Sequence, residues 1–127
     1  MKIQKIQTDT APAAIGPYSQ AILAGDILFA SGQIPINPQS GEIPEELEGQ
    51  ARQVFENILG VLGEAGLSFQ NIVKTTVFLK NFDDFSLMNQ IYSEFFSAPY
   101  PARSCVEVAR LPKDVLIEIE FIAVKQV

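Results

Sequence analysis

The stretch Pro101 to Glu120, PARSCVEVARLPKDVLIEIE, decides the fold that we predict for this chain. It contains two runs typical of β-strands, at about 103–109 and 115–124. The residues between them, Leu111-Pro112-Lys113-Asp114, have the composition of a turn. The stretch is therefore predicted to form a β-hairpin.

The second run has one face suited to a core and one face of mixed character. Its purely apolar face is expected to lie inside the protein and consists of Val115, Ile117, Ile119, Phe121 and Ala123. The opposite face begins at Leu116, carries Glu118 and Glu120, and becomes apolar again at Ile122 and Val124. A face that meets only water more often stays polar along its whole length. We therefore expect something outside the monomer to cover this mixed face.

The composition is that of one globular domain, predicted to span residues 1–127. Hydrophobic residues make up 47% of the chain and charged residues 19%. The net charge of −6 argues against a nucleic-acid partner. No signal-peptide pattern and no run of membrane-spanning length occur, so we expect no membrane partner. A single cysteine cannot form an internal disulfide, which favours a reducing, cytoplasmic location.

The absence of histidine restricts the chemistry available to the chain. It removes the commonest general base, the usual metal ligand and any Ser-His or Cys-His nucleophile pair. No metal-ligand spacing, phosphate-binding loop, dinucleotide fingerprint or nucleophile elbow occurs either. We therefore expect neither a metal nor a cofactor. Catalysis would have to use carboxylate, Arg, Lys, Tyr, Ser, Cys or backbone groups.

Two amphipathic helices are predicted. Residues 45–65 place apolar side chains at three- and four-residue steps, and Gly66 follows as a C-terminal cap. A second helix is expected to begin at a cap supplied by Asp83 or Asp84 and to end before Pro99.

Four further strands are predicted, over residues 2–7, 18–24, 27–31 and 72–79. The two-residue loop Gly25-Asp26 fits a hairpin turn of type II′. In this order, two helices and about six strands predict an α+β two-layer sandwich, with a mixed sheet packed on two helices.

Arg103 and two nearby acids are the residues best suited to a site on the hairpin. Alternation places Arg103, Cys105 and Glu107 on one face of the first run. The planar guanidinium of Arg103 fits a substrate carboxylate. Glu118 and Glu120, roughly 7 Å apart, could have split pKa values, so that one serves as a base. An ordinary ion pair of Arg103 with one of the three acids explains the same residues and, on sequence alone, is the more common outcome.

Other residues are candidates for lining such a site, namely Tyr18, Ser31, Gly32, Asn89 and Cys105. A lone cysteine is usually a small core residue, and without histidine its thiol would need Arg103 to lower its pKa. Backbone N–H groups beside Gly32 could hold an anion, although a turn explains this glycine equally well. Tyr18 more often packs than catalyses, and the amide of Asn89 must find partners if it is buried.

The chain resembles the RidA/YjgF family in segments that span nearly its whole length. The matching segments are AIGPYSQA (14–21), LFASGQIP (28–35), QARQVFENI (50–58), KTTVFL (74–79), D-F…N-x-x-Y-x-x-F-F (84–96) and PARSCVEVARLPKD…IEIE (101–120). The last segment is the most specific. Because no motif position departs from the pattern, the chain is similar to the RidA subgroup, which has deaminase activity.

The resemblance implies a chorismate-mutase-like fold assembled as a homotrimer, with sites in the clefts between subunits. It also implies hydrolysis of reactive enamines and imines, such as the 2-aminoacrylate released by pyridoxal-phosphate enzymes, to 2-keto acids and ammonia. No cofactor or metal is implied. Two alternatives exist within the family: a non-catalytic regulatory trimer that binds small 2-keto acids, and an endoribonuclease or translation inhibitor.

By motif position, the resemblance assigns Arg103 to the substrate carboxylate and Glu118 to the positioning and activation of water. The backbone of Cys105 would orient ligand and water, and Glu120 is left with a structural or rim role. The residues that would line the cleft are Tyr18, Ser31, Gly32 and Asn89. The neighbouring subunit would cover the apolar end of the mixed face.

Overall fold

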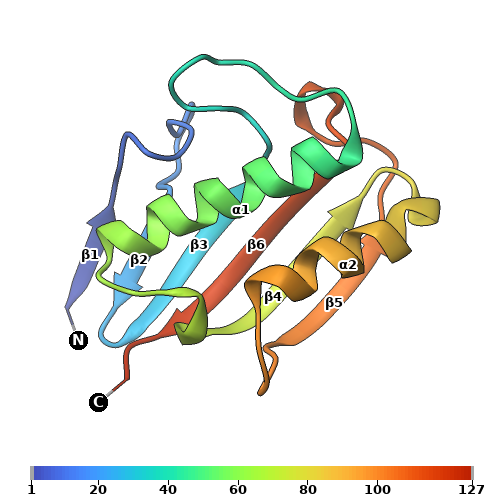
Figure 1. The fold of residues 1–127 in the computed structure, drawn as a ribbon. Coiled ribbons are helices and arrows are strands. Elements are labelled where there is room, and N and C mark those ends of the chain that lie inside the picture. The colour runs from blue at the N-terminus through green and yellow to red at the C-terminus, as the bar shows by residue number, and fades with distance from the viewer. Residues whose placement is uncertain (1, 127) are drawn as a thin grey trace.

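The computed structural model describes residues 2–126 as a six-stranded sheet with two helices over one of its faces (Figure 1). The strands are β1 (Ile3–Ile6), β2 (Ala21–Ala24), β3 (Ile27–Gln33), β4 (Ile72–Leu79), β5 (Ala102–Glu107) and β6 (Ile117–Val124). The helices are α1 (Leu47–Glu64) and α2 (Phe85–Phe95). Short 3₁₀ turns occupy Phe69–Asn71, Phe82–Asp84 and Pro112–Asp114. The predicted α+β two-layer architecture is confirmed.

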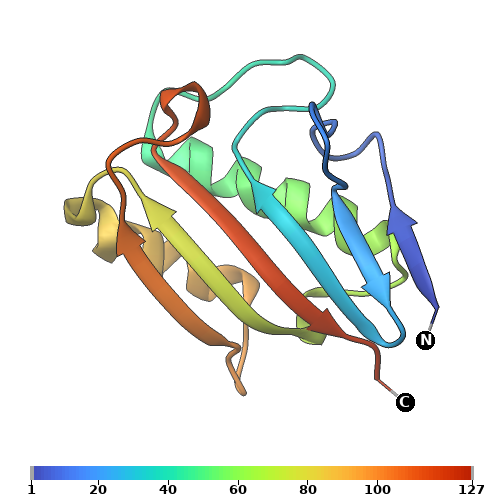
Figure 2. The ribbon, with the colours of Figure 1, turned by 180° about the vertical axis from the view of Figure 1, so that it is seen from behind.

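The sheet has the strand order β1-β2-β3-β6-β4-β5. Neighbouring strands are antiparallel except β4 and β5, which are parallel. The chain passes from β3 to β4 through α1 and from β4 to β5 through α2, so both helices cover the same face (Figure 1). Seen from behind, the opposite face of the sheet carries no helix within residues 2–126 (Figure 2). We call it the open face. Neither helix is long and apolar enough to cross a membrane.

The predicted C-terminal hairpin is wrong, because β4 lies between its two arms. β5 pairs with β4, whereas β6 pairs with β3 and with the other edge of β4. Backbone hydrogen bonds join the end of β4 to the segment after β5 and to the segment before β6. The N–H of Val108 donates to the carbonyl of Leu79 at 2.9 Å, and the N–H of Lys80 donates to the carbonyl of Leu116 at 3.0 Å. Residues 108–116 therefore form a wide connection that steps over one strand.

The buried faces follow the predicted periodicities. The apolar face of the last run is buried as expected, at Val115, Ile117, Ile119, Phe121 and Ala123. The inner stripe of α1 is buried at Leu47, Ala51, Val54, Phe55, Ile58 and Leu62. The predicted cap at Gly66 is confirmed. Its φ is +73°, its N–H donates to the carbonyl of Gly63, and the N–H of Leu67 donates to the carbonyl of Leu62, which together form a Schellman motif.

Three local details differ from or refine the prediction. The hairpin at Gly25 is confirmed, with a φ of +62° at this glycine. β2 begins at Ala21, so Tyr18 lies in the preceding loop and not in a strand. Asp84 makes no capping bond at the start of α2, so the predicted aspartate cap is wrong. Instead, the Oδ1 of Asn81 accepts the N–H of Asp83 at 2.9 Å, one turn earlier.

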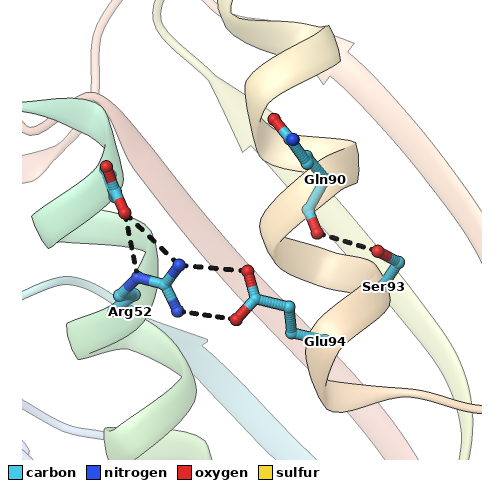
Figure 3. Close-up of polar contacts among 5 residues, drawn as sticks. Arg52, Gln90, Ser93 and Glu94 are labelled. Atoms are coloured by element: carbon cyan, nitrogen blue, oxygen red, sulfur yellow. Dashed lines mark hydrogen bonds and ion pairs between the residues drawn. The ribbon is translucent and has the colours of Figure 1, made fainter.

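α2 is held against α1 by charges at its surface as well as by packing. Figure 3 shows Arg52 of α1 donating to both carboxylate oxygens of Glu94 on α2, each at 3.0 Å. Arg52 also pairs with Glu48 on its own helix at 3.3 Å. Because these groups are exposed, the ion pairs orient α2 more than they stabilise the fold.

Aromatic packing between α1 and α2 is the stronger tie. Phe55 is fully buried, and its ring stacks on Phe95 with the centroids 4.4 Å apart. It also meets Tyr92, Phe96 and Phe69 at centroid distances of 5.9, 6.0 and 6.2 Å. These edge-on and stacked geometries are the favourable ones for aromatic pairs.

We predict that Phe55→Ala lowers the free energy of unfolding by about 3–5 kcal/mol, because it leaves a cavity at the centre of this aromatic cluster. The measurement is urea unfolding at one fixed protein concentration. Leu59→Ala on the same helix is the control. Its side chain is 45% exposed, and its effect should stay within about 0.5 kcal/mol. Equal losses for the two variants would contradict the role given to Phe55.

Candidate active site

The candidate residues occupy opposite faces of the sheet. The pairing register aligns Thr75 of β4 with Arg103 on one side and Phe121 on the other, so these three point toward the helices. Phe78 aligns with Glu118, so Glu118 points to the open face. A hairpin that pairs the two runs directly would bring Arg103, Cys105 and the two acids onto one face. That prediction is wrong for one chain, because β4 lies between β5 and β6.

On the helix face, Arg103 lies against one stripe of α2. Its Nη1 donates to Oδ1 of Asn89 at 2.7 Å. The central carbon of the guanidinium lies 4.8 Å from the ring centre of Tyr92 and 5.6 Å from that of Phe85. The three helix residues are spaced i, i+4 and i+7, so they follow each other along one side of α2. We call Arg103, Asn89 and Cys105 the Arg103 half-site.

The ordinary ion pair that competes with ligand binding does not form within residues 2–126. The ion pairs of that part of the chain use Arg52 and Arg110, and not Arg103. Glu107, a possible partner, accepts the N–H of Phe82 at 2.8 Å instead. A guanidinium has five N–H donors, and Asn89 takes one of them. The half-buried Arg103 therefore retains donors for a carboxylate.

Cys105 lies two residues after Arg103 on the same face and is half-buried against the core. Burial raises the pKa of its thiol, and the nearby charge of Arg103 only partly offsets this rise. The condition stated above for a nucleophilic thiol, a pKa lowered by Arg103, is therefore not met. The environment of Cys105 therefore does not favour its sulfur as a nucleophile.

On the open face, the side chain of Glu118 lies over the backbone of Gly32. A methyl group at position 32 would come within 3.0 Å of Cγ and 2.8 Å of Cδ of Glu118, and would overlap Oε2. The φ of Gly32 lies outside the left-handed region. Glycine at this position therefore leaves space for the Glu118 carboxylate, and its backbone conformation is one that other residues adopt. The turn explanation considered from the sequence is replaced by this contact.

Ser31 and Gly32 form a β-bulge in β3. Ala30 pairs with Phe121 and Gln33 with Ile119, so both residues together face Glu120. The N–H of Ser31 donates to the carbonyl of Gln20 at 3.0 Å, and its hydroxyl donates to the carbonyl of Ser19 at 2.7 Å. This backbone N–H is consequently not available for the anion that the sequence suggested.

Tyr18 and Gly32 line the same cavity, of about 290 Å³, between the loop at Pro12–Tyr18 and the turn at Pro112 and Lys113. Tyr18 is 53% exposed. We call Tyr18, Ser31, Gly32 and Glu118 the Glu118 half-site.

The two acids share the open face, as predicted. Burial, and to a smaller extent the charge of Glu120, raise the pKa of Glu118. Glu120 itself is exposed. An ordinary edge pair balanced by Lys113, Arg110 or Arg103 would also explain two acids on one face, but neither acid forms an ion pair within residues 2–126. Arg110 pairs with Asp114 at 2.8 Å instead.

The sequence reasoning missed the residues that hold Arg103. From the sequence, Phe85 and Tyr92 entered only as part of the family segment at 84–96, without a role beside Arg103. Thr75 was also overlooked, although its buried hydroxyl lies 2.8 Å from that of Tyr92. The available signal was the spacing F-x-x-x-N-x-x-Y from residue 85, which places two aromatic rings and an amide on one helix face.

The Endoribonuclease L-PSP family model matches residues 8–125. The chain belongs to the RidA/YjgF family. Among its RidA/YjgF relatives, a RutC family protein of Pasteurella multocida is 58% identical, over 94% of this chain and 96% of the relative. The Escherichia coli K12 protein named 2-iminobutanoate/2-iminopropanoate deaminase is 54% identical, over 95% and 97%. The crystal structure of E. coli TdcF with bound serine matches this RidA/YjgF fold with a TM-score of 0.93 at 51% identity, covering 97% of this chain and 99% of that one.

We predict that alkylation of Cys105 by iodoacetamide continues to accelerate above about pH 8.5, the pKa of an unperturbed thiol, because burial raises its pKa. Arg103→Ala should raise this pKa further, because the positive charge that lowers it is gone. The rate is measured by mass spectrometry across a pH series. The unfolded chain in guanidinium serves as the control with an ordinary pKa. A rate that levels off at neutral pH would show that the thiol is activated after all.

Proposed function

We propose that this protein hydrolyses reactive 2-imino and 2-enamino acids to 2-keto acids and ammonia. The observation that carries the proposal is the guanidinium of Arg103. It is held against α2 by Asn89 and Tyr92, it forms no ion pair within residues 2–126, and it retains N–H donors for a carboxylate. Two relatives support it: the 54% identical E. coli protein named for this deaminase activity, and E. coli TdcF, whose structure contains serine, a small carboxylate-bearing molecule.

The proposed site forms between subunits of a homotrimer. Because Arg103 and Glu118 lie on opposite faces of the sheet, one chain cannot bring them together. The Arg103 half-site of one subunit would meet the Glu118 half-site of its neighbour. The open face also exposes Phe29 (48%) and Val106 (43%), which are apolar residues that a neighbouring subunit would cover.

The chemistry requires few groups. The enamine tautomerises to an imine, and protonation of the imine nitrogen makes the C=N carbon electrophilic. The carboxylate of Glu118 takes a proton from water as the water oxygen bonds to that carbon, and a carbinolamine forms. Glu118 returns the proton to the nitrogen. As the C–N bond then breaks, the hydroxyl proton passes to the Glu118 carboxylate, so that ammonia leaves and the 2-keto acid remains. Because water also attacks such imines unaided, orientation and one base are sufficient.

The environment of Glu118 suits this role. Its raised pKa makes its carboxylate a stronger base than an exposed glutamate. Arg103 would select substrates through two parallel hydrogen bonds to their carboxylate. Imines of this kind arise at pyridoxal-phosphate enzymes, which we propose as the functional partners in a cytoplasmic, reducing environment.

Two other functions are separable from this one. A trimer that only binds 2-keto acids would bind them at Arg103 without accelerating ammonia release. The serine bound in the E. coli TdcF structure is compatible with a binding function as well. An endoribonuclease, the activity in the family description, is disfavoured by the net charge of −6 and the lack of histidine.

Arg103→Ala should lower kcat/KM for deamination by at least about a hundredfold, because two charge-assisted hydrogen bonds to the substrate are lost. Ammonia release is measured while a dehydratase generates 2-aminoacrylate from serine. The control is Arg110→Ala, which removes an exposed guanidinium paired with Asp114. Unchanged activity in Arg103→Ala would refute the assignment. Binding of 2-ketobutyrate by a wild-type protein without turnover would favour the binding-only function.

Mixing two inactive variants tests whether the site is shared. Arg103→Ala and Glu118→Gln chains, unfolded together and reassembled, should regain activity. A site is intact when its Arg103 comes from a Glu118→Gln chain and its Glu118 comes from an Arg103→Ala chain. Equal mixing gives roughly a quarter of all sites this composition. Each variant reassembled alone is the control. No recovery in mixed trimers of confirmed composition would place both groups in one subunit.

Gly32→Ala should lower kcat strongly while leaving thermal stability nearly unchanged. The added methyl displaces the Glu118 carboxylate, which is the flexible end of a side chain. The matched control is Gly63→Ala on α1, where an added methyl meets nothing within 4 Å. Steady-state kinetics and thermal melts of both variants make the comparison. Full activity in Gly32→Ala would show that the position of Glu118 over this glycine is irrelevant to catalysis.

A further inference from the structure

Tyr92 is the residue on which Arg103 rests. Its ring centre lies 4.8 Å from the central guanidinium carbon, closer than the ring of Phe85 at 5.6 Å. A guanidinium offers its flat faces to aromatic rings and its edges to hydrogen-bond acceptors. Because Tyr92 meets the guanidinium through its ring, this contact uses none of the N–H donors of Arg103. Asn89 takes one N–H donor, and the remaining donors can meet a carboxylate.

Tyr92 is itself fixed from both ends. Its hydroxyl lies 2.8 Å from the buried hydroxyl of Thr75 on β4, so one donates to the other. The other side of the residue packs against Phe96 and Phe55, with ring centroids 4.4 and 5.9 Å away. Tyr92 is only 5% exposed. A buried ring held by a strand and by the aromatic cluster gives Arg103 a rigid surface.

We infer that Tyr92 is a positioning residue that sets the plane of the Arg103 guanidinium, and through it the orientation of a bound carboxylate. This inference rests on the proposed function. An arginine side chain has several rotatable bonds, and ordering them upon ligand binding costs free energy. The ring of Tyr92 and the amide of Asn89 order the guanidinium before the ligand arrives.

The test measures the dissociation constant of 2-ketobutyrate by calorimetry, together with kcat/KM for the imine. Tyr92→Leu should weaken binding about tenfold, as expected for loss of a partly desolvated cation–π contact. Tyr92→Phe keeps the ring and should stay within about threefold of the wild type. Phe95→Leu is the control, because Phe95 belongs to the same cluster and stacks on Phe55 without contacting Arg103. Tyr92→Met, which fills the space without a ring, replaces Tyr92→Leu if the latter does not fold.

A double-mutant cycle separates positioning from general packing. In an Arg103→Ala background, Tyr92→Leu should cause no further loss, because the group through which it acts is absent. Equal losses in both backgrounds, or a loss in Phe95→Leu as large as that in Tyr92→Leu, overturn the inference. If Arg103→Ala abolishes binding and Tyr92→Leu leaves it unchanged, the proposed function stands and this inference fails. If Arg103→Ala leaves binding intact, both fail.

Discussion

The pairing of β4 with a strand on each of its edges is the constraint on which the rest of the structure depends. It inserts an apolar strand between β5 and β6, which are close neighbours in sequence. Because paired residues point to the same side, the register on β4 determines which side chains of both neighbours face the helices. Arg103 is thereby directed to α2 and Glu118 to the open face. The division of the candidate site follows from hydrogen bonding in the sheet.

α2 connects the stability of the core to the chemistry of the arginine. One stripe of this helix carries Phe85, Asn89 and Tyr92, which touch the guanidinium. Neighbouring positions carry Phe95 and Glu94, which join α2 to α1. The side chain that we propose to bind the substrate carboxylate is therefore supported by the buried aromatic cluster between the two helices. Active sites built this way keep their geometry because the supporting residues have no freedom to move.

Sequence patterns predicted those features that depend on near neighbours in the chain. The helical stripe ending at Gly66, the strand at 72–79 and the buried face from Val115 to Ala123 arise from local periodicity, and all three were found. Strand pairing is not local. Leu111–Asp114 has the composition of a hairpin turn, and nothing within it reveals that residues from much earlier in the chain separate the two arms. The family resemblance supplied the roles expected for the candidate site residues, but their distribution over two faces required the register.

If the proposed site is divided between two faces of the sheet, its activity would depend on the protein concentration. If each active centre needs surfaces from two chains, an isolated chain carries both half-sites but no complete site. Dilution below the dissociation constant of the assembly would then remove activity without unfolding or inhibiting the protein, by mass action alone. Because the open face seen in Figure 2 would need a partner chain, activity would rise more steeply than in proportion to the protein concentration.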